Sequence, residues 1–379
     1  MIKTAFVFGT RPECIKLAPV IRAVDEHPGM ESIVISSSQH TDLLAPFLES
    51  FDVRVDHDLQ IMQPGQTPNE VLSKVLLTLE TLLSEEQPDL VLVQGDTTTA
   101  LAGALTAFHA DIPVGHVEAG LRTHDVRAPF PEEMNRRLIS RLASYHFAAT
   151  KENIENLLRE GVSPSAIWHT GNPVVDALQW ILKNQCPSEF VTELIKAHAG
   201  KKLIVLTTHR RESFGKTMVE NLRALARFVK ATSNCVVIFP VHPNPSVRKA
   251  TKEALLGAAA GFEIIDSLNY ADFIHLLSAS WLIISDSGGV QEEAPSLGKR
   301  LIVLRRNTER PEVVRSGIAK LIGDNPQLLV ETLKSADSDI GWISAASTKQ
   351  ELFGSGNAAQ KIIDVIQRVC RRESQAGHR

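Results

Sequence analysis

The fold of this chain is decided by the stretch 281–298, which reads WLIISDSGGVQEEAPSLG. The apolar run at 281–284 is bounded by polar residues, a pattern typical of a strand buried on both faces. Residues 290–297 can form a helix, so the Ser-Gly-Gly at 287–289 would lie in the turn at its N-terminus. Unpaired N–H groups and the positive end of the helix dipole converge at such a turn. The stretch is therefore a candidate site for a phosphate or diphosphate.

The turn by itself leaves a plain structural role open, because a strand, a glycine turn and a helix occur in any α/β protein. Two carboxylates, Glu292 and Glu293, follow within the first helical turn, and one of them could reach a ribose hydroxyl. The neighbouring motifs have to decide between the two interpretations.

The same order of strand, polar turn and helix recurs along the whole chain. Strands are expected at 4–8, 33–35, 90–93, 114–117, 146–149 and 167–170, and again at 203–206, 236–239, 262–265, 281–285 and 301–304. Strands that alternate with helices form parallel sheets. The sequence therefore predicts an α/β protein with two doubly wound, Rossmann-like domains.

The helical pattern weakens between residues 183 and 201, so we place the domain junction there. The expected domains are residues 1–185, which carry the catalytic carboxylates, and residues 186–356, which bind the nucleotide. Residues 357–379 are expected to form a helix and tail that pack back on the N-terminal domain, with residues 371–379 frayed.

Composition is that of a soluble globular protein, with 43% hydrophobic and 22% charged residues. A net charge of -4 argues against general nucleic-acid affinity and gives no sign of an acidic-membrane partner. The N-terminus leads straight into a strand, and no stretch is apolar enough for a bilayer, so we expect a cytoplasmic protein with no membrane partner. The spacing of cysteines and histidines predicts no metal site and no disulfide framework.

Charged side chains follow the predicted strands, at the edge where a parallel sheet gathers its ligands. Arg11 and Lys16 lie beside a helix N-terminus, as an anionic ligand requires, although Arg11 could also be a surface charge. Asp96 and Glu118 end two apolar strands, where an idle carboxylate is costly, so we interpret both as functional. Glu132 begins a helix, where an acidic residue also serves as a simple cap.

Seven motifs stand in order along nearly the whole chain: GTRPE at 9–13, QGDT at 94–97, HVEAGLRT at 116–123, PEE at 131–133, HRRE at 209–212, SDSGGVQEEAP at 285–295 and TERPE at 308–312. Together they closely resemble the bacterial non-hydrolysing UDP-N-acetylglucosamine 2-epimerases. The resemblance implies a fold like that of the GT-B glycosyltransferases, with the active site in the interdomain cleft, and it implies a homodimer.

The resemblance also implies a reaction: reversible conversion of UDP-N-acetylglucosamine (UDP-GlcNAc) to UDP-N-acetylmannosamine without added cofactor, for cell-envelope polysaccharide precursors. In the family's mechanism the C2 proton is removed as UDP leaves in an anti-elimination. UDP then re-adds to the 2-acetamidoglucal, with protonation from the opposite face. The positions that match catalytic groups are Asp96, Glu118, Glu132 and His209. Those that match the UDP site are Arg11, Lys16, Phe273, Ser287, Gly288, Gly289, Glu293 and Arg310.

Allosteric members of this family bind a second UDP-GlcNAc beside the first. The positions that match this second site are Gln39, Gln66, Glu133, Arg210 and His242. The match is uneven, because Thr41 and Asp42 replace a longer basic and polar pair, and Gly65 stands where some members carry arginine.

Two other functions share these features. A GT-B glycosyltransferase with a UDP-sugar donor would have the same fold and nucleotide turn, but it would require an acceptor. A non-catalytic sugar-nucleotide sensor would keep the UDP contacts and have no need of the carboxylates. Which carboxylate serves which face of C2 does not follow from the sequence.

Overall fold

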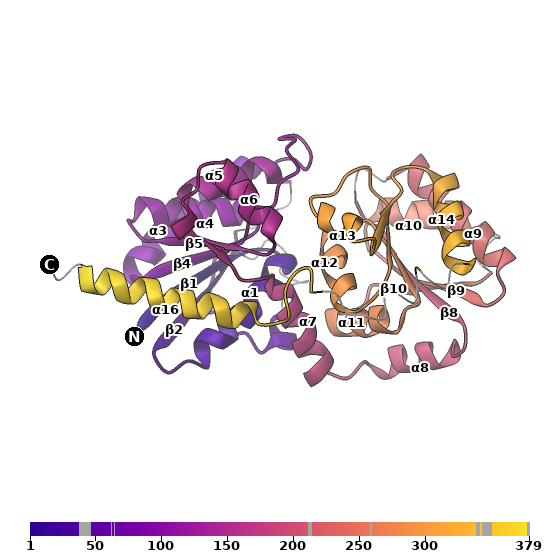
Figure 1. The fold of residues 1–379 in the computed structure, drawn as a ribbon, viewed down its shortest axis with the longest axis horizontal. Coiled ribbons are helices and arrows are strands. Elements are labelled where there is room, and N and C mark those ends of the chain that lie inside the picture. Colours follow the sequence, from indigo (N-terminus) through magenta and orange to yellow (C-terminus); the bar gives the residue numbers. More distant parts are fainter. Residues whose placement is uncertain are drawn as a thin grey trace. The chain divides into compact units, whose positions relative to one another are not determined.

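The computed structural model describes residues 1–37, 47–61, 63, 65–210, 214–257, 260–338, 342 and 351–376, the last five of these by their backbone alone. The chain forms two compact units, each with its own sheet (Figure 1). Unit 1 comprises Met1–Gln179 and Phe353–Arg379, and unit 2 comprises Trp180–Leu352. The boundary falls inside helix α7 (Pro173–Asn184), ahead of the junction expected after residue 185.

Unit 1 is built on seven parallel strands in the order β3-β2-β1-β4-β5-β6-β7. The central strands are apolar and buried on both faces, as a parallel sheet covered by helices requires. Gly103 of the overlying helix α4 (Thr98–His109) lets this helix lie close to the sheet, since a Cβ there would come within 3.1 Å of Val7 and Val93. The strands are β1 (Ile2–Phe8), β2 (Met30–Ser36), β3 (His57–Asp58), β4 (Leu90–Gln94), β5 (Val114–Ala119), β6 (Tyr145–Ala148) and β7 (Ile167–His169).

The helices of unit 1 begin at caps that the sequence supplies. Thr10 and Glu13 form a capping box for α1, Thr67 and Glu70 form one for α3, and the Thr97 hydroxyl accepts from the first turn of α4. The helices are α1 (Arg11–Asp25), α3 (Pro68–Glu86), α4 (Thr98–His109), α5 (Glu132–Leu142), α6 (Lys151–Arg159) and α16 (Ala358–Ala376), with a short 3₁₀ turn at Pro164–Ala166.

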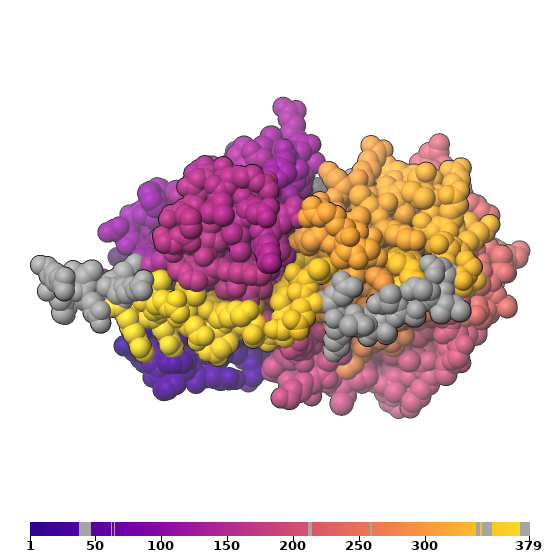
Figure 2. Space-filling view, viewed as in Figure 1, coloured from indigo at the N-terminus to yellow at the C-terminus, as the bar shows by residue number. Residues whose placement is uncertain are grey.

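The C-terminal helix α16 belongs to unit 1, packs on α1 and lies on the surface of this unit (Figure 2). Asp176 fixes its start by accepting from the backbone N–H groups of Ala358 and Ala359. The helix continues to Ala376, beyond residue 371, where the sequence predicted the tail to begin.

Unit 2 contains six parallel strands in the order β10-β9-β8-β11-β12-β13. They are β8 (Lys202–Thr207), β9 (Cys235–Val241), β10 (Phe262–Asp266), β11 (Leu282–Ser285), β12 (Leu301–Val303) and β13 (Ala319–Leu321). The helices are α8 (Glu189–Ala197), α9 (Lys216–Ala231), α10 (Pro245–Leu255), α11 (Tyr270–Ala279), α12 (Gly288–Ser296), α13 (Pro311–Arg315) and α14 (Pro326–Ser338).

Helix α8 lies where the sequence pattern predicted a weakly structured junction. The Ser188 hydroxyl caps its first turn, and the helix packs on α11. The backbone N–H of Ser188 donates to Asp272 of α11 at 2.7 Å, which holds the start of α8 in place. A contact with α11, which is distant in the sequence, therefore stabilises a segment whose own helical pattern is weak.

Both sheets reverse their strand order at one point, between β1 and β4 in unit 1 and between β8 and β11 in unit 2. The predicted pair of doubly wound parallel sheets is thus confirmed. In such sheets a crevice opens beyond the carboxyl ends of the strands at the reversal, and ligands bind there. None of the described helices is long and apolar enough to cross a membrane.

Candidate active site

Glu118 is a tightly held carboxylate at the carboxyl edge of the unit 1 sheet. Its side chain is only 5% exposed and pairs with the ammonium group of Lys16 from α1. Gln94, the last residue of β4, donates to one carboxylate oxygen, and Asn172 donates to the other at 3.0 Å. Three donors from separate segments therefore fix the position of this carboxylate.

The backbone at Glu118 is also unusual, because its φ of 65° lies in the left-handed region. A non-glycine residue in this region is strained by about 1–3 kcal/mol and persists only where its surroundings impose it. Gly120 follows with a φ of 89°, and a Cβ there would lie 2.2 Å from the Asn153 carbonyl oxygen. This geometry explains why the motif after β5 needs a glycine, and it turns Glu118 toward the end of β4.

Asp96 follows β4 and is held by helix α5. Its carboxylate pairs with Arg136 at 2.6 Å, and its backbone carbonyl accepts from Asn135 at 2.8 Å. A Cβ at the preceding residue, Gly95, would lie 3.6 Å from a carboxylate oxygen of Glu118. The structure therefore brings the turn that carries Asp96 next to Glu118.

Glu133, a predicted residue of the second substrate site, is buried in unit 1. Its carboxylate accepts from Arg136 at 3.1 Å, from Arg137 at 3.3 Å and from the backbone N–H of Thr123 at 3.0 Å. Arg136 thus bridges Glu133 and Asp96. The adjacent Glu132 opens α5 and is half-buried.

Two further titratable groups shape the turns around these carboxylates. Glu13 accepts from the N–H groups of Gly9 and Thr10 and from the hydroxyls of Thr10 and Thr97, which ties the turn after β1 to the start of α4. Burial raises the pKa of Glu13 to about 7, although these hydrogen bonds lower it. Burial lowers the pKa of His116 to about 4, so the neutral ring donates to the Gly95 carbonyl oxygen at 2.8 Å.

The remaining predicted residues of unit 1 lie in different surroundings. The guanidinium of Arg11 lies over the Phe47 ring, 4.9 Å from its centroid. Gln66 closes its own loop, donating to the Ile61 carbonyl oxygen and accepting from the N–H of Gln63. Gln39 lies outside the described residues.

In unit 2, Arg310 lies against the start of α12. Its guanidinium donates to Glu292 at 2.6 Å and to Glu309 at 2.6 Å, and all three side chains are nearly fully buried. A Cβ at Gly288 would come within 2.9 Å of Nη1 of Arg310, whereas one at Gly289 would meet nothing closer than 3.9 Å. A side chain at the first glycine of the turn would therefore force the guanidinium to shift, and the guanidinium lies directly against the turn.

Asp286 lies between β11 and this turn and is fully buried. Its carboxylate accepts from the Thr208 hydroxyl at 2.7 Å and from the N–H groups of His209 and Arg210. The Nδ1 atom of His209 lies 3.5 Å from the same carboxylate, and the His209 ring stacks on His242 with 5.3 Å between centroids. Three predicted residues, His209, Arg210 and His242, are thus brought together around a residue that the sequence analysis left out.

The other predicted UDP residues lie at α11 and α12. Glu293 accepts from the hydroxyl of Tyr270 at 2.9 Å, which orients the carboxylate from the opposite helix. Phe273, one turn further along α11, is half-buried. Ser287 is the N-cap residue of α12, and its carbonyl oxygen accepts from Gln291.

Sequence reasoning missed the residues that hold the functional ones in place: Gln94, Asn172, Arg136, Asp286, Glu292 as a partner of Arg310, and Glu309. Some of them stand inside the motifs quoted above, so position in a motif was the available signal for Asp286 and Glu309. Asn172 stands in no such motif, and only the folded chain places it on Glu118. Within the described residues, no group of three or more His, Cys, Asp or Glu side chains is arranged to hold a metal ion.

The family of the chain follows from its likeness to known proteins. A family model described as UDP-N-acetylglucosamine 2-epimerase matches residues 22–367. The UDP-N-acetylglucosamine 2-epimerase of Escherichia coli K12 is 43% identical over 370 residues, which cover 96% of this chain and 98% of that protein.

Solved structures agree. The crystal structure of UDP-GlcNAc 2-epimerase from Neisseria meningitidis, bound to UDP-GlcNAc, has a TM-score of 0.90 at 38% identity and covers 97% of this chain and 100% of that one. Acinetobacter baumannii MurG, at 14% identity and a TM-score of 0.61 over 97% of this chain and 99% of that one, shares the fold alone, in line with the expected GT-B-like class. This chain therefore belongs to the UDP-N-acetylglucosamine 2-epimerase family.

Proposed function

We propose that this chain interconverts UDP-GlcNAc and UDP-N-acetylmannosamine by anti-elimination and re-addition of UDP, and so supplies cell-envelope polysaccharide precursors. The observation that carries the proposal is the carboxylate of Glu118, fixed by Lys16, Gln94 and Asn172 beside the turn that presents Asp96. Two acidic side chains at adjacent strand ends fit a reaction that moves a proton on either face of one carbon.

The proposed chemistry divides between the two units. Asp96, Glu118 and Glu132 of unit 1 remove and return the proton at C2, a kind of catalysis that typically contributes about 10²–10⁴-fold in rate. His209 of unit 2 donates a hydrogen bond or a proton to the diphosphate oxygen as the bond from C1 breaks. The intermediate is 2-acetamidoglucal, and protonation on the opposite face of C2 gives the epimer.

The same proposal gives unit 2 the task of keeping UDP after the bond breaks. The turn at Ser287, Gly288 and Gly289 offers N–H groups and the α12 dipole to the diphosphate, and Arg310 adds a fixed positive charge. Glu293, oriented by Tyr270, accepts from a ribose hydroxyl, and Phe273 lies near the uracil. Arg11 and Lys16 of unit 1 add further positive charge. Retained UDP can re-add, which makes the reaction an epimerisation and not a hydrolysis.

Incubation with UDP-GlcNAc in D₂O tests the proposal. Proton NMR should show loss of the C2 proton signal and the appearance of the manno epimer, since the proton returned to C2 then comes from solvent. A fully retained C2 proton in folded protein would falsify the proposal. Sugar transfer to an added acceptor with C2 unexchanged would identify a glycosyltransferase, and UDP binding without any turnover would identify a sensor.

We also propose a second UDP-GlcNAc site that includes His242, Arg210, Gln66, Glu133 and Gln39. It is supported by the stacking of His242 on His209, because a ligand at His242 would then adjoin the proposed catalytic ring. Initial rates across substrate concentrations test this, and the expected curve is sigmoidal. A hyperbolic curve without a lag would argue against activation by substrate.

We further propose that the chain forms a homodimer. Large apolar side chains are exposed on the adjacent helices α3, α4 and α5 of unit 1: Leu77 at 69%, Phe108 at 57%, Met134 at 41% and Leu138 at 44%. Apolar side chains gathered in this way are typical of an association surface. Light scattering after size-exclusion chromatography should give the mass of two chains, and Phe108→Lys should shift it toward one.

A further inference from the structure

We propose that Asp286 is a positioning residue for His209, and that it turns the imidazole so that Nε2 meets the leaving diphosphate. The inference rests on the proposed function, in which His209 acts on that group. It adds a residue that holds the ring in the orientation required for the transfer.

Asp286 accepts hydrogen bonds from three consecutive residues, Thr208, His209 and Arg210. The carboxylate is fully buried and accepts at 2.7 Å from the hydroxyl of Thr208, at 3.0 Å from the N–H of His209, and at 3.0 Å from the N–H of Arg210. Its other oxygen lies 3.5 Å from Nδ1 of His209. A buried carboxylate is stable only when donors satisfy it, and here the donors come from the segment that carries His209.

Asp286 lies between the loop that carries His209 and the turn at the start of α12. Strands β8 and β11 are neighbours at the point where the strand order of unit 2 reverses, and Ser285 pairs with Thr207. Asp286 follows β11 directly and precedes Ser287, the N-cap of α12. A single residue therefore links the loop that carries His209 to the turn proposed for the diphosphate.

The ring of His209 is held on two sides. Nδ1 faces Asp286, and the stacked ring of His242 covers one face at an interplanar angle of 16°. A doubly protonated ring can donate from Nδ1 to Asp286 and from Nε2 to a diphosphate oxygen. As the bond from C1 to this oxygen breaks, the Nε2 proton moves to UDP and the neutral ring keeps its proton on Nδ1. Re-addition of UDP returns the proton to Nε2.

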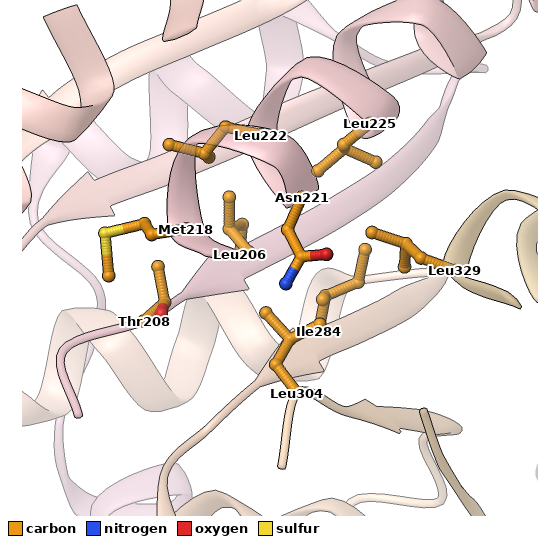
Figure 3. A pocket seen from close by; sticks show the side chains of 9 residues that line it. All are labelled: Leu206, Thr208, Met218, Asn221, Leu222, Leu225, Ile284, Leu304 and Leu329. Atoms are coloured by element: carbon orange, nitrogen blue, oxygen red, sulfur yellow. The ribbon is translucent and has the colours of Figure 1, made fainter. Parts of the chain in front are cut away.

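Substitution of Thr208 offers a second test of Asp286, because the Thr208 hydroxyl donates to its carboxylate. Its side chain borders a small cavity of about 10 Å³ lined mainly by apolar side chains, including Leu206 and Met218 (Figure 3). Asn221 points into the same cavity, and none of the described residues donates to its Oδ1. Thr208 and Asn221 thus share an environment, but only the Thr208 hydroxyl is bonded to Asp286, which makes the two residues a matched pair.

The main experiment is Asp286→Asn in the full-length chain, with kcat and KM for UDP-GlcNAc and the Kd of UDP measured alongside wild type. An amide keeps the shape but supports the wrong tautomer of a catalytic histidine, a change that costs up to about 10⁴ in kcat in serine proteases. We expect kcat to fall by about 10²-fold or more, while KM and the Kd of UDP stay within about threefold. A kcat within about threefold of wild type would overturn the inference.

Thr208→Val and Asn221→Leu keep the inference testable if Asp286→Asn fails to fold. Thr208→Val should lower kcat about three- to tenfold, the value of one hydrogen bond, and Asn221→Leu should leave kcat unchanged. Equal kcat values for Thr208→Val and wild type, or an equal loss in both variants, would refute the role of Asp286.

Nitrogen-15 NMR of labelled histidine separates this inference from the proposed function, because it needs no turnover. The His209 signals, assigned by their loss in His209→Gln, should show the neutral ring protonated on Nδ1. If wild type exchanges no C2 proton, the proposed function fails while the orientation of the ring can still be read. If the neutral ring carries its proton on Nε2, the inference fails even in an active epimerase.

Discussion

The two units use opposite charges at the same edge of similar sheets. In unit 1, the cation of Lys16 supports the carboxylate of Glu118. In unit 2, the carboxylates of Glu292 and Glu309 support the cation of Arg310. In both units the supporting and the supported side chains are buried, with exposures of 7% for Lys16 and 5% for Glu118, and of 6% for Arg310 beside 1% for Glu292 and 4% for Glu309.

This difference fits the proposed division of roles between the two units. Carboxylates suit proton transfer at carbon, whereas a guanidinium and a helix N-terminus suit the negative charge of a diphosphate. Breaking a buried pair by removing one partner is costly, typically about 3–5 kcal/mol, because the other charge stays behind. Substitutions that break these pairs should therefore lower stability in both units, whereas the effect on function should differ, with a loss of turnover in unit 1 and a loss of UDP affinity in unit 2.

The largest effect is expected in unit 1, from Glu118→Gln. The amide cannot take up the C2 proton, so kcat should fall by about 10³-fold while the Kd of UDP stays within about threefold. Kinetic assays and calorimetric UDP titrations measure the two quantities. Glu155→Gln, an exposed acid on α6, is the control and should change neither. A large loss of UDP affinity in Glu118→Gln would move this residue from catalysis to binding and erase the division between the units.

In unit 2, Arg310→Met should destabilise the protein by about 3–5 kcal/mol and weaken UDP binding, because the buried Glu292 loses the cation with which it pairs and Glu309 keeps only its pair with Arg305. Urea unfolding monitors the first effect. The double variant Arg310→Met with Glu292→Gln should regain part of the stability but none of the affinity. Arg306→Met, whose side chain is 81% exposed, should cost less than about 1 kcal/mol. An equal loss of unfolding free energy in Arg306→Met and Arg310→Met would show that the buried charge network of unit 2 does not stabilise the protein more than an exposed ion pair does.

Glu13 is a buried carboxylate of unit 1 that accepts hydrogen bonds from backbone N–H groups and hydroxyls. The pH dependence of stability should show the effect of its burial. Burial raises the pKa of its carboxyl group from the ordinary value of 4.5 to about 7, so as pH rises from 4.5 to 7 the unfolded chain loses this proton before the folded chain does. The stability of wild type relative to Glu13→Gln should therefore fall over this interval, by up to about 3 kcal/mol. Urea unfolding of both proteins across the interval measures this. A relative stability that rises with pH would show that the hydrogen bonds outweigh burial.

The smallest expected effect is a difference in stability between alanine substitutions at the two glycines of the unit 2 turn. Gly288→Ala should cost about 1–2 kcal/mol, because its Cβ would lie 2.9 Å from Nη1 of Arg310, which must shift. Gly289→Ala meets its nearest atom at 3.9 Å and should be neutral or slightly stabilising within a helix. Thermal unfolding distinguishes them. Equal stability of the two variants would contradict the close packing of Arg310 on the turn.

Most of the strands and their parallel arrangement could be predicted, because each is an apolar run followed by a polar turn. Local periodicity failed where a distant contact decides the structure. Helix α8 was missed since it depends on Asp272 of α11, and the length of α16 was underestimated. The candidate site divides in the same way: Asp96, Glu118 and His209 stand out at strand ends, while Arg136 and Asn172 have no local signal that assigns them to these groups.

The sequence by itself determined the alternation that makes two parallel sheets, the motifs that mark the family, and the residue types gathered after the strands. These are local properties, because they depend on the spacing of apolar residues and on the residue types in the turns. Only the tertiary structure decided which charges meet, because Lys16 and Glu118 are 102 positions apart, and Asp286 and Thr208 are 78 apart. A charged side chain that is removed from water must be paired. The partner then holds the charged group in one position, and that position decides which ligand atoms the group can reach.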